Sequence, residues 1–119
     1  MEYEFFSDKD FKNATPSCSI FDMDDNLLIM LDKLRKIIGQ PVIINSAYRT
    51  TEYEKSKRRS GSSSHCKGKA VDIRCVSDSY KFLIVQTALA LGFKRIGIGS
   101  TYVHLDIDEE KNQNVLWTY

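Results

Sequence analysis

The sequence predicts a small α+β domain in which a mainly antiparallel sheet is flanked by helices. Two segments with helical periodicity, residues 24–38 and 77–91, are separated by short β-branched segments, and a hairpin of residues 94–107 follows them. Irregular segments interrupt this order, which favours an α+β architecture over a regular parallel α/β one. A chain of 119 residues is expected to form one domain, residues 1–119, with a single core of modest size.

Residues 1–20 are expected to be largely irregular. A cap at Ser7 followed by the apolar Phe11 predicts one short helical turn, which Pro16 ends.

The first long helix is predicted over residues 24–38. Acidic residues at its start and basic residues at its end match the helix dipole. Gly39 is a suitable C-cap, and Pro41 prevents the helix from continuing. Its apolar positions recur at three- and four-residue spacing and are Leu27, Leu28, Leu31, Leu34, Ile37 and Ile38.

The middle of the chain is predicted to alternate between strands and helices. Residues 41–48 and 70–75 are rich in β-branched residues and predict strands. Residues 50–57 predict a short helix, and the serine-rich residues 60–64 predict a flexible loop. A Ser-Asp cap then begins the second long helix, which ends at Gly92.

The C-terminal third predicts two paired strands, residues 94–98 and 102–107, joined by a turn at Gly99 and Ser100. The tail, residues 114–119, is apolar enough to pack against the domain. Trp117 within it is expected to anchor the core rather than to line a binding surface.

Composition argues against several kinds of partner. The net charge of +1 provides no general case for nucleic acid or a membrane surface, and the basic run of residues 55–59 is expected to be a solvated helix end or loop. The longest apolar run, around residues 82–91, is too short to span a bilayer. The N-terminus lacks the features of a secretory signal, which predicts synthesis in the cytoplasm.

The cysteines predict neither a disulfide framework nor a metal knuckle. Cys18, Cys66 and Cys75 are an odd number and form no Cys-x-x-Cys pair. Cys66 adjoins His65, but neighbours on an extended segment point to opposite faces, so Cys66 is expected to face away from any site that His65 forms.

The two histidines of the chain predict its chemistry. His65 lies seven residues before Asp72, and His104 lies on the second strand of the predicted hairpin. Two imidazoles and one carboxylate form a complete protein ligand set for a catalytic zinc ion, with a fourth position open. Alternation places His104 and Asp106 on the strand face opposite the core, and Asp72 on the face opposite its apolar neighbours. The simpler alternative is a polar, solvated sheet face.

Four separated segments resemble one family. His65–Ile73 (HCKGKAVDI) is similar to the zinc-binding signature of the M15 peptidases, and Ile44–Thr50 (INSAYRT) to the strand that ends in their Ser-x-Tyr-Arg motif. Tyr102–Asp106 (YVHLD) resembles their last ligand strand, and the closing Trp117-x-Tyr119 is also similar. These peptidases are zinc D-Ala-D-Ala carboxypeptidases and related phage cell-wall endopeptidases. They share a fold with the signalling domain of hedgehog proteins, and the resemblance covers nearly the whole chain.

The resemblance implies Zn²⁺ held by His65, Asp72 and His104, and a substrate among the stem peptides of peptidoglycan. The zinc would polarise the scissile carbonyl and lower the pKa of a water molecule. Arg49 occupies the place of a substrate-contacting arginine. Many family members carry a carboxylate shortly before the last ligand, but this chain has Thr101 there. Asp106 remains as the general base, as a residue that orients a ligand, or as a ligand itself.

The resemblance also implies where the protein acts. A phage- or bacterium-encoded enzyme that is made without a signal peptide and acts on the cell wall is expected, as a monomer. Two alternatives stay open. One is a non-catalytic zinc-containing binding module of the same fold, and the other is a plain α+β domain without metal.

Overall fold

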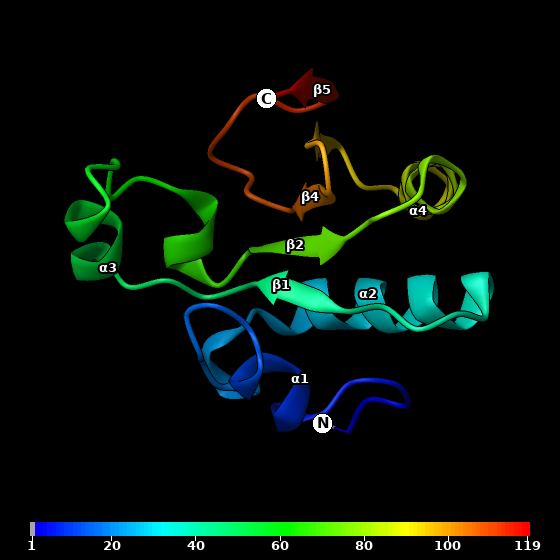
Figure 1. Ribbon diagram of the computed structural model, residues 1–119, viewed down its shortest axis with the longest axis horizontal. Coiled ribbons are helices and arrows are strands. Elements are labelled where there is room, and N and C mark those ends of the chain that lie inside the picture. The colour runs from blue at the N-terminus through cyan, green and yellow to red at the C-terminus, as the bar shows by residue number, and fades with distance from the viewer. Residues whose placement is uncertain (1) are drawn as a thin grey trace.

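The computed structural model describes residues 2–119 and is an α+β fold with one five-stranded sheet (Figure 1). The strands are ordered β1-β2-β4-β3-β5, and every neighbouring pair is antiparallel except β3 and β5. The helical elements are α1 (Asp8–Lys12), the 3-10 helix η1 (Ile20–Asp22), α2 (Asp25–Ile38), α3 (Thr51–Ser56), the 3-10 helix η2 (Ser64–Lys67) and α4 (Asp78–Leu91). The strands are β1 (Ile44–Ser46), β2 (Ala70–Arg74), β3 (Arg95–Ile98), β4 (Tyr102–Asp106) and β5 (Val115–Thr118).

The two long helices predicted from the periodicity of the sequence are confirmed as α2 and α4. The Asp24 side chain caps α2 by accepting hydrogen bonds from the amides of Asn26 and Leu27, and Gly39 ends it in the left-handed conformation. Helices α2 and α4 pack against each other, and their buried side chains join those of the sheet in one core. The sheet contributes Val71, Ile73, Ile96, Val103 and Leu105 to that core.

Alternation along the strands leaves the second face of the sheet for polar residues. Asp72 lies directly opposite His104, and Ala70 lies opposite Asp106, in the β2–β4 register. The sheet therefore has an apolar face under the long helices and a polar face that carries the predicted site residues.

Two local predictions need correction. The first strand is only Ile44–Ser46, because its pairing with β2 shifts register there and Pro41 has no amide to contribute. The tail packs against the domain as expected, and it does so as β5, parallel to β3. His65 and Cys66 lie in η2 rather than on an extended segment, so the reason given for their opposite directions is wrong.

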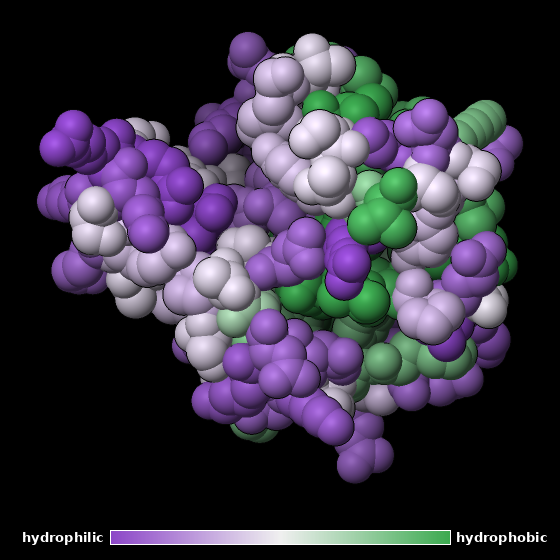
Figure 2. Space-filling view, in the orientation of Figure 1, coloured by the Kyte–Doolittle hydropathy of each residue, from purple (hydrophilic) through white to green (hydrophobic). Residues whose placement is uncertain are grey.

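The face of the molecule in Figure 2 shows where hydrophilic and apolar side chains gather. Hydrophilic side chains gather over α3 and the segment that follows it, at the left of Figure 2. Apolar side chains reach the surface toward α4, where Phe82 and Leu89 are exposed. No helix within residues 2–119 has the length and hydropathy to cross a membrane.

We expect Gly68→Ala to destabilise the protein through its backbone. Gly68 has a φ of 69°, and a Cβ there would collide with the main-chain oxygen of Asp22. The left-handed conformation alone costs a non-glycine residue about 1–2 kcal/mol, and the collision adds to this cost. Urea unfolding measures the loss. Gly39→Ala is the matched control, because Gly39 has a φ of 65° but nothing within 4 Å of its added Cβ. Equal losses in the two variants would contradict the role assigned to the close packing.

Candidate metal centre

The fold brings His65, Asp72 and His104 together on the polar face of the sheet. One ligand atom from each lies within 4.8 Å of the others. The Nε2 atom of His65 lies 3.3 Å from Asp72 Oδ1, and the Nδ1 atom of His104 lies 3.0 Å from the same oxygen. Both histidines are buried, at 2% and 7% exposure. The three residues predicted as zinc ligands therefore form one cluster.

His65 is held in place by the segment that follows β1. Its Nδ1 atom lies 2.7 Å from the carbonyl oxygen of Ala47, and its own carbonyl accepts a hydrogen bond from the Arg49 amide. The Ser63 side chain caps η2 by accepting from the His65 amide, and Gly68 ends η2 in the left-handed conformation. The chain then turns directly into β2, which carries Asp72.

The outer nitrogen of each imidazole donates a hydrogen bond away from the cluster. A carbonyl oxygen only accepts, so His65 carries its proton on Nδ1. Both nitrogens of His104 face carboxylates, and Nε2 lies closer to Asp106 Oδ2, at 2.7 Å, than Nδ1 lies to Asp72 Oδ1, at 3.0 Å. We therefore place the single proton of the neutral ring on Nε2, where it is donated to Asp106. In the neutral imidazoles, the inner nitrogens therefore direct lone pairs at the Asp72 carboxylate.

Such a convergence of lone pairs requires a cation. Protons on the inner nitrogens meet this need, and so does a metal ion bound by all three residues. Two neutral imidazoles and one carboxylate, with the outer N–H groups fixed by acceptors, match the donor set of a catalytic zinc site. The residues present fit zinc.

Electrostatics in the cluster agree with this need for a cation. Burial alone would lower the pKa of His104, but its hydrogen bonds to the carboxylates of Asp106 and Asp72 outweigh burial and raise that pKa. Burial alone would raise the pKa of Asp72, but hydrogen bonds from His104 and His65 together hold it well below its usual range. Asp72 is thus ionised and ready to bind a cation.

Asp106 is fully engaged by its neighbours. Besides His104 on Oδ2, its Oδ1 accepts from Arg95 Nε at 2.7 Å and from the Asp108 amide at 3.1 Å. The side chain is buried, and these contacts and the neighbouring charges outweigh burial to lower its pKa. Its geometry is that of a carboxylate that orients a metal-binding histidine.

The cluster opens into a pocket of about 520 Å³. Arg49, Glu54 and Arg59 contribute charged groups to its lining, and Tyr102, Trp117 and Tyr119 contribute aromatic rings. A pocket of about 620 Å³ at the N-terminal region, lined by residues such as Tyr3 and Phe21, contains none of the predicted site residues. The 520 Å³ pocket is therefore the one that adjoins the predicted site residues.

Glu54 ties two arginines to the wall of this pocket. Its buried carboxylate lies 2.8 Å from Arg59 Nε and 3.5 Å from Arg49 Nε. Arg49 and Glu54 therefore form an ion pair without hydrogen-bond geometry. Arg49 Nε is a buried donor that finds no hydrogen-bond partner within residues 2–119. The Arg49 guanidinium is thus held in the pocket with donor capacity left for a ligand.

Trp117 lies in the site rather than in the core. Its half-buried ring packs 5.4 Å from the His104 ring, and the Arg95 guanidinium lies 5.0 Å from it. Gly97 makes this possible, because a Cβ at that position would lie 2.7 Å from the indole. The expectation that Trp117 anchors the core is therefore wrong.

Sequence reasoning missed several groups that shape the site. The Ala47 carbonyl leaves no signal in the residue type. Arg95 had an indirect signal, because alternation on β3 places it on the polar face opposite Asp106. Glu54 lies in the predicted short helix of residues 50–57, and Arg59 lies in the basic run expected to be a solvated helix end or loop. Only the turn after α3 brings Arg59 back to Glu54.

A His-Asp-His cluster beside a polar pocket, on the open face of a mainly antiparallel sheet, has the donor set of a metallohydrolase centre. Residues 8–108 match the family Peptidase M15, and the chain belongs to this family. The M15 peptidases are zinc-dependent, so membership indicates a zinc metallopeptidase and confirms the resemblance seen in the four segments. No curated protein matches the chain.

Proposed function

We propose that the protein hydrolyses peptide bonds in the D-Ala-containing stem peptides of peptidoglycan, with zinc bound by His65, Asp72 and His104. The convergence of the two inner imidazole nitrogens on the Asp72 carboxylate carries the proposal. Family membership supports peptide hydrolysis, and the pocket beside the cluster offers room for a peptide. The proposed place of action is the bacterial cell wall, reached by a monomeric enzyme.

The polar residues closest to the cluster have proposed roles. When bound, zinc supplies a Lewis acid for the peptide carbonyl and a water molecule of lowered pKa. Asp106 keeps His104 in the tautomer that presents the Nδ1 lone pair, and the Arg95 contact holds Asp106 in turn. Arg49 binds a substrate carboxylate or the oxygen that gains charge during hydrolysis, through the donors that Glu54 leaves free.

Purified peptidoglycan tests the proposal directly. The zinc-loaded protein is expected to release stem-peptide fragments, and a chelator is expected to stop the release until zinc is restored. Mass spectrometry of the fragments identifies the bond and distinguishes a carboxypeptidase, which releases a terminal residue, from an endopeptidase. A zinc-loaded protein that leaves both peptidoglycan and isolated stem peptides intact would overturn the proposed activity.

Zinc affinity is expected to fall as the pH falls through the pKa of His104. That pKa is raised above its ordinary value of 6.5, so the imidazolium is retained to higher pH and its proton must leave before zinc binds. The loss therefore begins above pH 6.5 and approaches about tenfold per pH unit below the pKa. Chelator competition across the titration range of histidine, about pH 5–8, measures it. An affinity that is constant over this range would contradict ligation by histidine.

A non-catalytic zinc module is the second candidate, and one observation favours it. Within the described lining of the pocket, the carboxylates are Glu54, Asp72 and Asp106, and each is engaged by cationic or imidazole partners. Thr101 stands where many M15 peptidases carry a further carboxylate. A protein that binds zinc and stem peptides without cutting them would establish this function instead.

A further inference from the structure

Asp108 is a buried carboxylate outside the pocket, and the roles proposed above do not involve its side chain. It follows β4, and its exposure is 0%. A buried carboxylate is costly unless cations or hydrogen-bond donors surround it. The contacts that satisfy Asp108 therefore show which parts of the chain it ties together.

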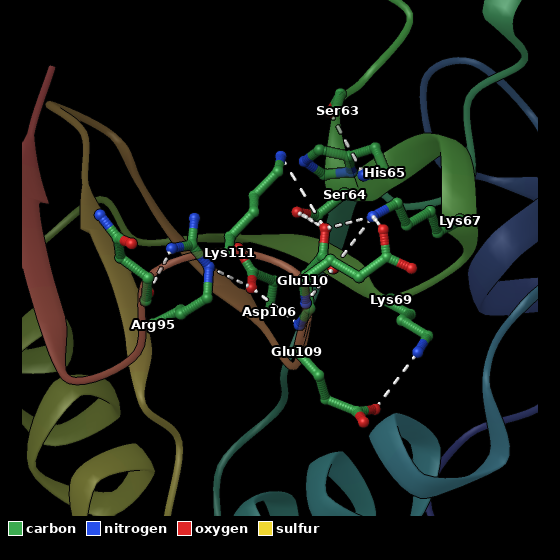
Figure 3. A network of polar contacts seen from close by, with 12 residues as sticks. Ser63, Ser64, His65, Lys67, Lys69, Arg95, Asp106, Glu109, Glu110 and Lys111 are labelled. Atoms are coloured by element: carbon green, nitrogen blue, oxygen red, sulfur yellow. Dashed lines mark hydrogen bonds and ion pairs between the residues drawn. The ribbon is translucent and has the colours of Figure 1, made fainter.

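Its side chain holds the segment that carries His65. Ser64, the residue before His65, donates its hydroxyl to Asp108 Oδ2 at 2.8 Å. Lys67 Nζ donates to both carboxylate oxygens, at 3.0 and 3.1 Å. Figure 3 shows the side chains of Ser64 and Lys67, from the turn that contains His65, pointing into one network of polar contacts. Burial alone would raise the pKa of Asp108, but these donors outweigh it and lower that pKa, so the carboxylate is charged.

Its backbone amide contacts the carboxylate that pairs with His104. The Asp108 amide donates to Asp106 Oδ1 at 3.1 Å, while Asp106 Oδ2 accepts from His104. Asp108 thus contacts both Ser64, the neighbour of His65, and Asp106, the partner of His104, although Ser64 and Asp108 are 44 positions apart in the chain.

We propose that Asp108 is a positioning residue that sets the spacing of His65 and His104 for zinc. The inference rests on the proposed zinc site, but Asp108 touches neither the metal nor the substrate. Contacts outside the ligands typically change metal affinity 10–100-fold when they are lost. Without the Asp108 carboxylate, η2 loses its buried side-chain connection to the end of β4 and keeps its backbone contacts, so the separation of the two inner nitrogens is held less tightly.

A neighbouring ion pair provides a matched control. Lys69 and Glu109 join the same two segments at 3.3 Å, but the Glu109 side chain is 81% exposed. Figure 3 shows this pair to one side of the network. An exposed pair of this kind contributes little to rigidity. Glu109→Gln therefore changes the charge of the same loop without removing the buried connection.

The test is zinc affinity, measured by chelator competition, together with the visible spectrum of the cobalt(II)-loaded protein. Asp108→Asn keeps the side-chain shape but presents an amide to the donors of Ser64 and Lys67, and about 10–100-fold weaker zinc binding is expected. Ser64→Ala is expected to weaken binding in the same direction and by less, while Glu109→Gln is expected to match the wild type. The cobalt spectrum should change in Asp108→Asn and Ser64→Ala, because it reports ligand geometry rather than stability.

Wild-type affinity and an unchanged cobalt spectrum in a folded Asp108→Asn would overturn the inference and leave the proposed function intact. If Asp108→Asn does not fold, Ser64→Ala decides by the same two measurements. If Glu109→Gln weakened zinc binding as much as Asp108→Asn, the inference would also be overturned, because the charge of the loop would then explain both losses. Failure of the wild-type protein to bind zinc would instead defeat the proposed function itself.

Discussion

His65→Ala is expected to abolish zinc binding and peptide hydrolysis together. The substitution leaves one imidazole and one carboxylate, which is too few protein ligands for a catalytic zinc site. Zinc supplies several kcal/mol of transition-state stabilisation, so hydrolysis should fall at least about 10³-fold. Metal analysis after purification without chelator should find less than about a tenth of an equivalent of zinc in the variant.

A second substitution separates metal loss from damage to the fold. Asp72→Asn keeps the size of the side chain and removes the charge on which both histidines converge. It should lose zinc and activity as His65→Ala does. Cys66→Ala is the matched control, because Cys66 adjoins His65 in η2 but does not line the pocket. Full cleavage by His65→Ala would refute the assignment of the metal site.

Arg49→Ala is expected to leave zinc in place and reduce hydrolysis by about 10²–10³-fold, the effect of removing one donor to developing charge. Glu54 keeps Arg59 as a partner, so the fold should survive the change. Arg49→Lys should recover little, because an ammonium group lacks the planar paired donors of a guanidinium. Steady-state kinetics on a soluble stem peptide, with zinc content measured in parallel, provides both readouts.

The control for Arg49 is Arg74→Ala, which removes an exposed arginine of β2 that does not line the pocket. It should retain wild-type kinetics. If Arg49→Ala also retains them, the arginine serves only to pair with Glu54, and another group must contact the substrate. If Arg49→Ala loses zinc as well, the role of the side chain is structural, acting through its ion pair with Glu54.

Local physical chemistry explains why much of the fold is predictable. Helices α2 and α4 carry their own caps and apolar faces, and the hairpin of β3 and β4 pairs neighbours in the chain. Parallel pairing of β5 with β3 is different, because it joins residues that do not follow one another through a tight turn. The length of β1 depends on a register shift against β2, which no periodicity within β1 records.

In the site, too, local patterns are predictable from the sequence and contacts between distant segments are not. Strand alternation places His104, Asp106 and Asp72 on the polar face from sequence alone, and the β2–β4 register puts Asp72 opposite His104. The role of Asp106 stayed open among base, orienting group and ligand, because the choice depends on its partners Arg95 and the Asp108 amide. Those partners support the orienting role.

The sequence by itself determined the residue types at the centre, the faces on which two of them lie, and the family to which the motifs belong. The residue types and faces follow from spacing and periodicity, which act over a few residues, and the family follows from the resemblance of four short motifs. The tertiary structure alone decided that His65 meets the other two, that Trp117 joins them, and that Glu54 and Asp108 hold the surroundings. Each of these depends on contacts between segments far apart in the chain, where burial requires charges and hydrogen-bond donors to find partners that no local pattern specifies.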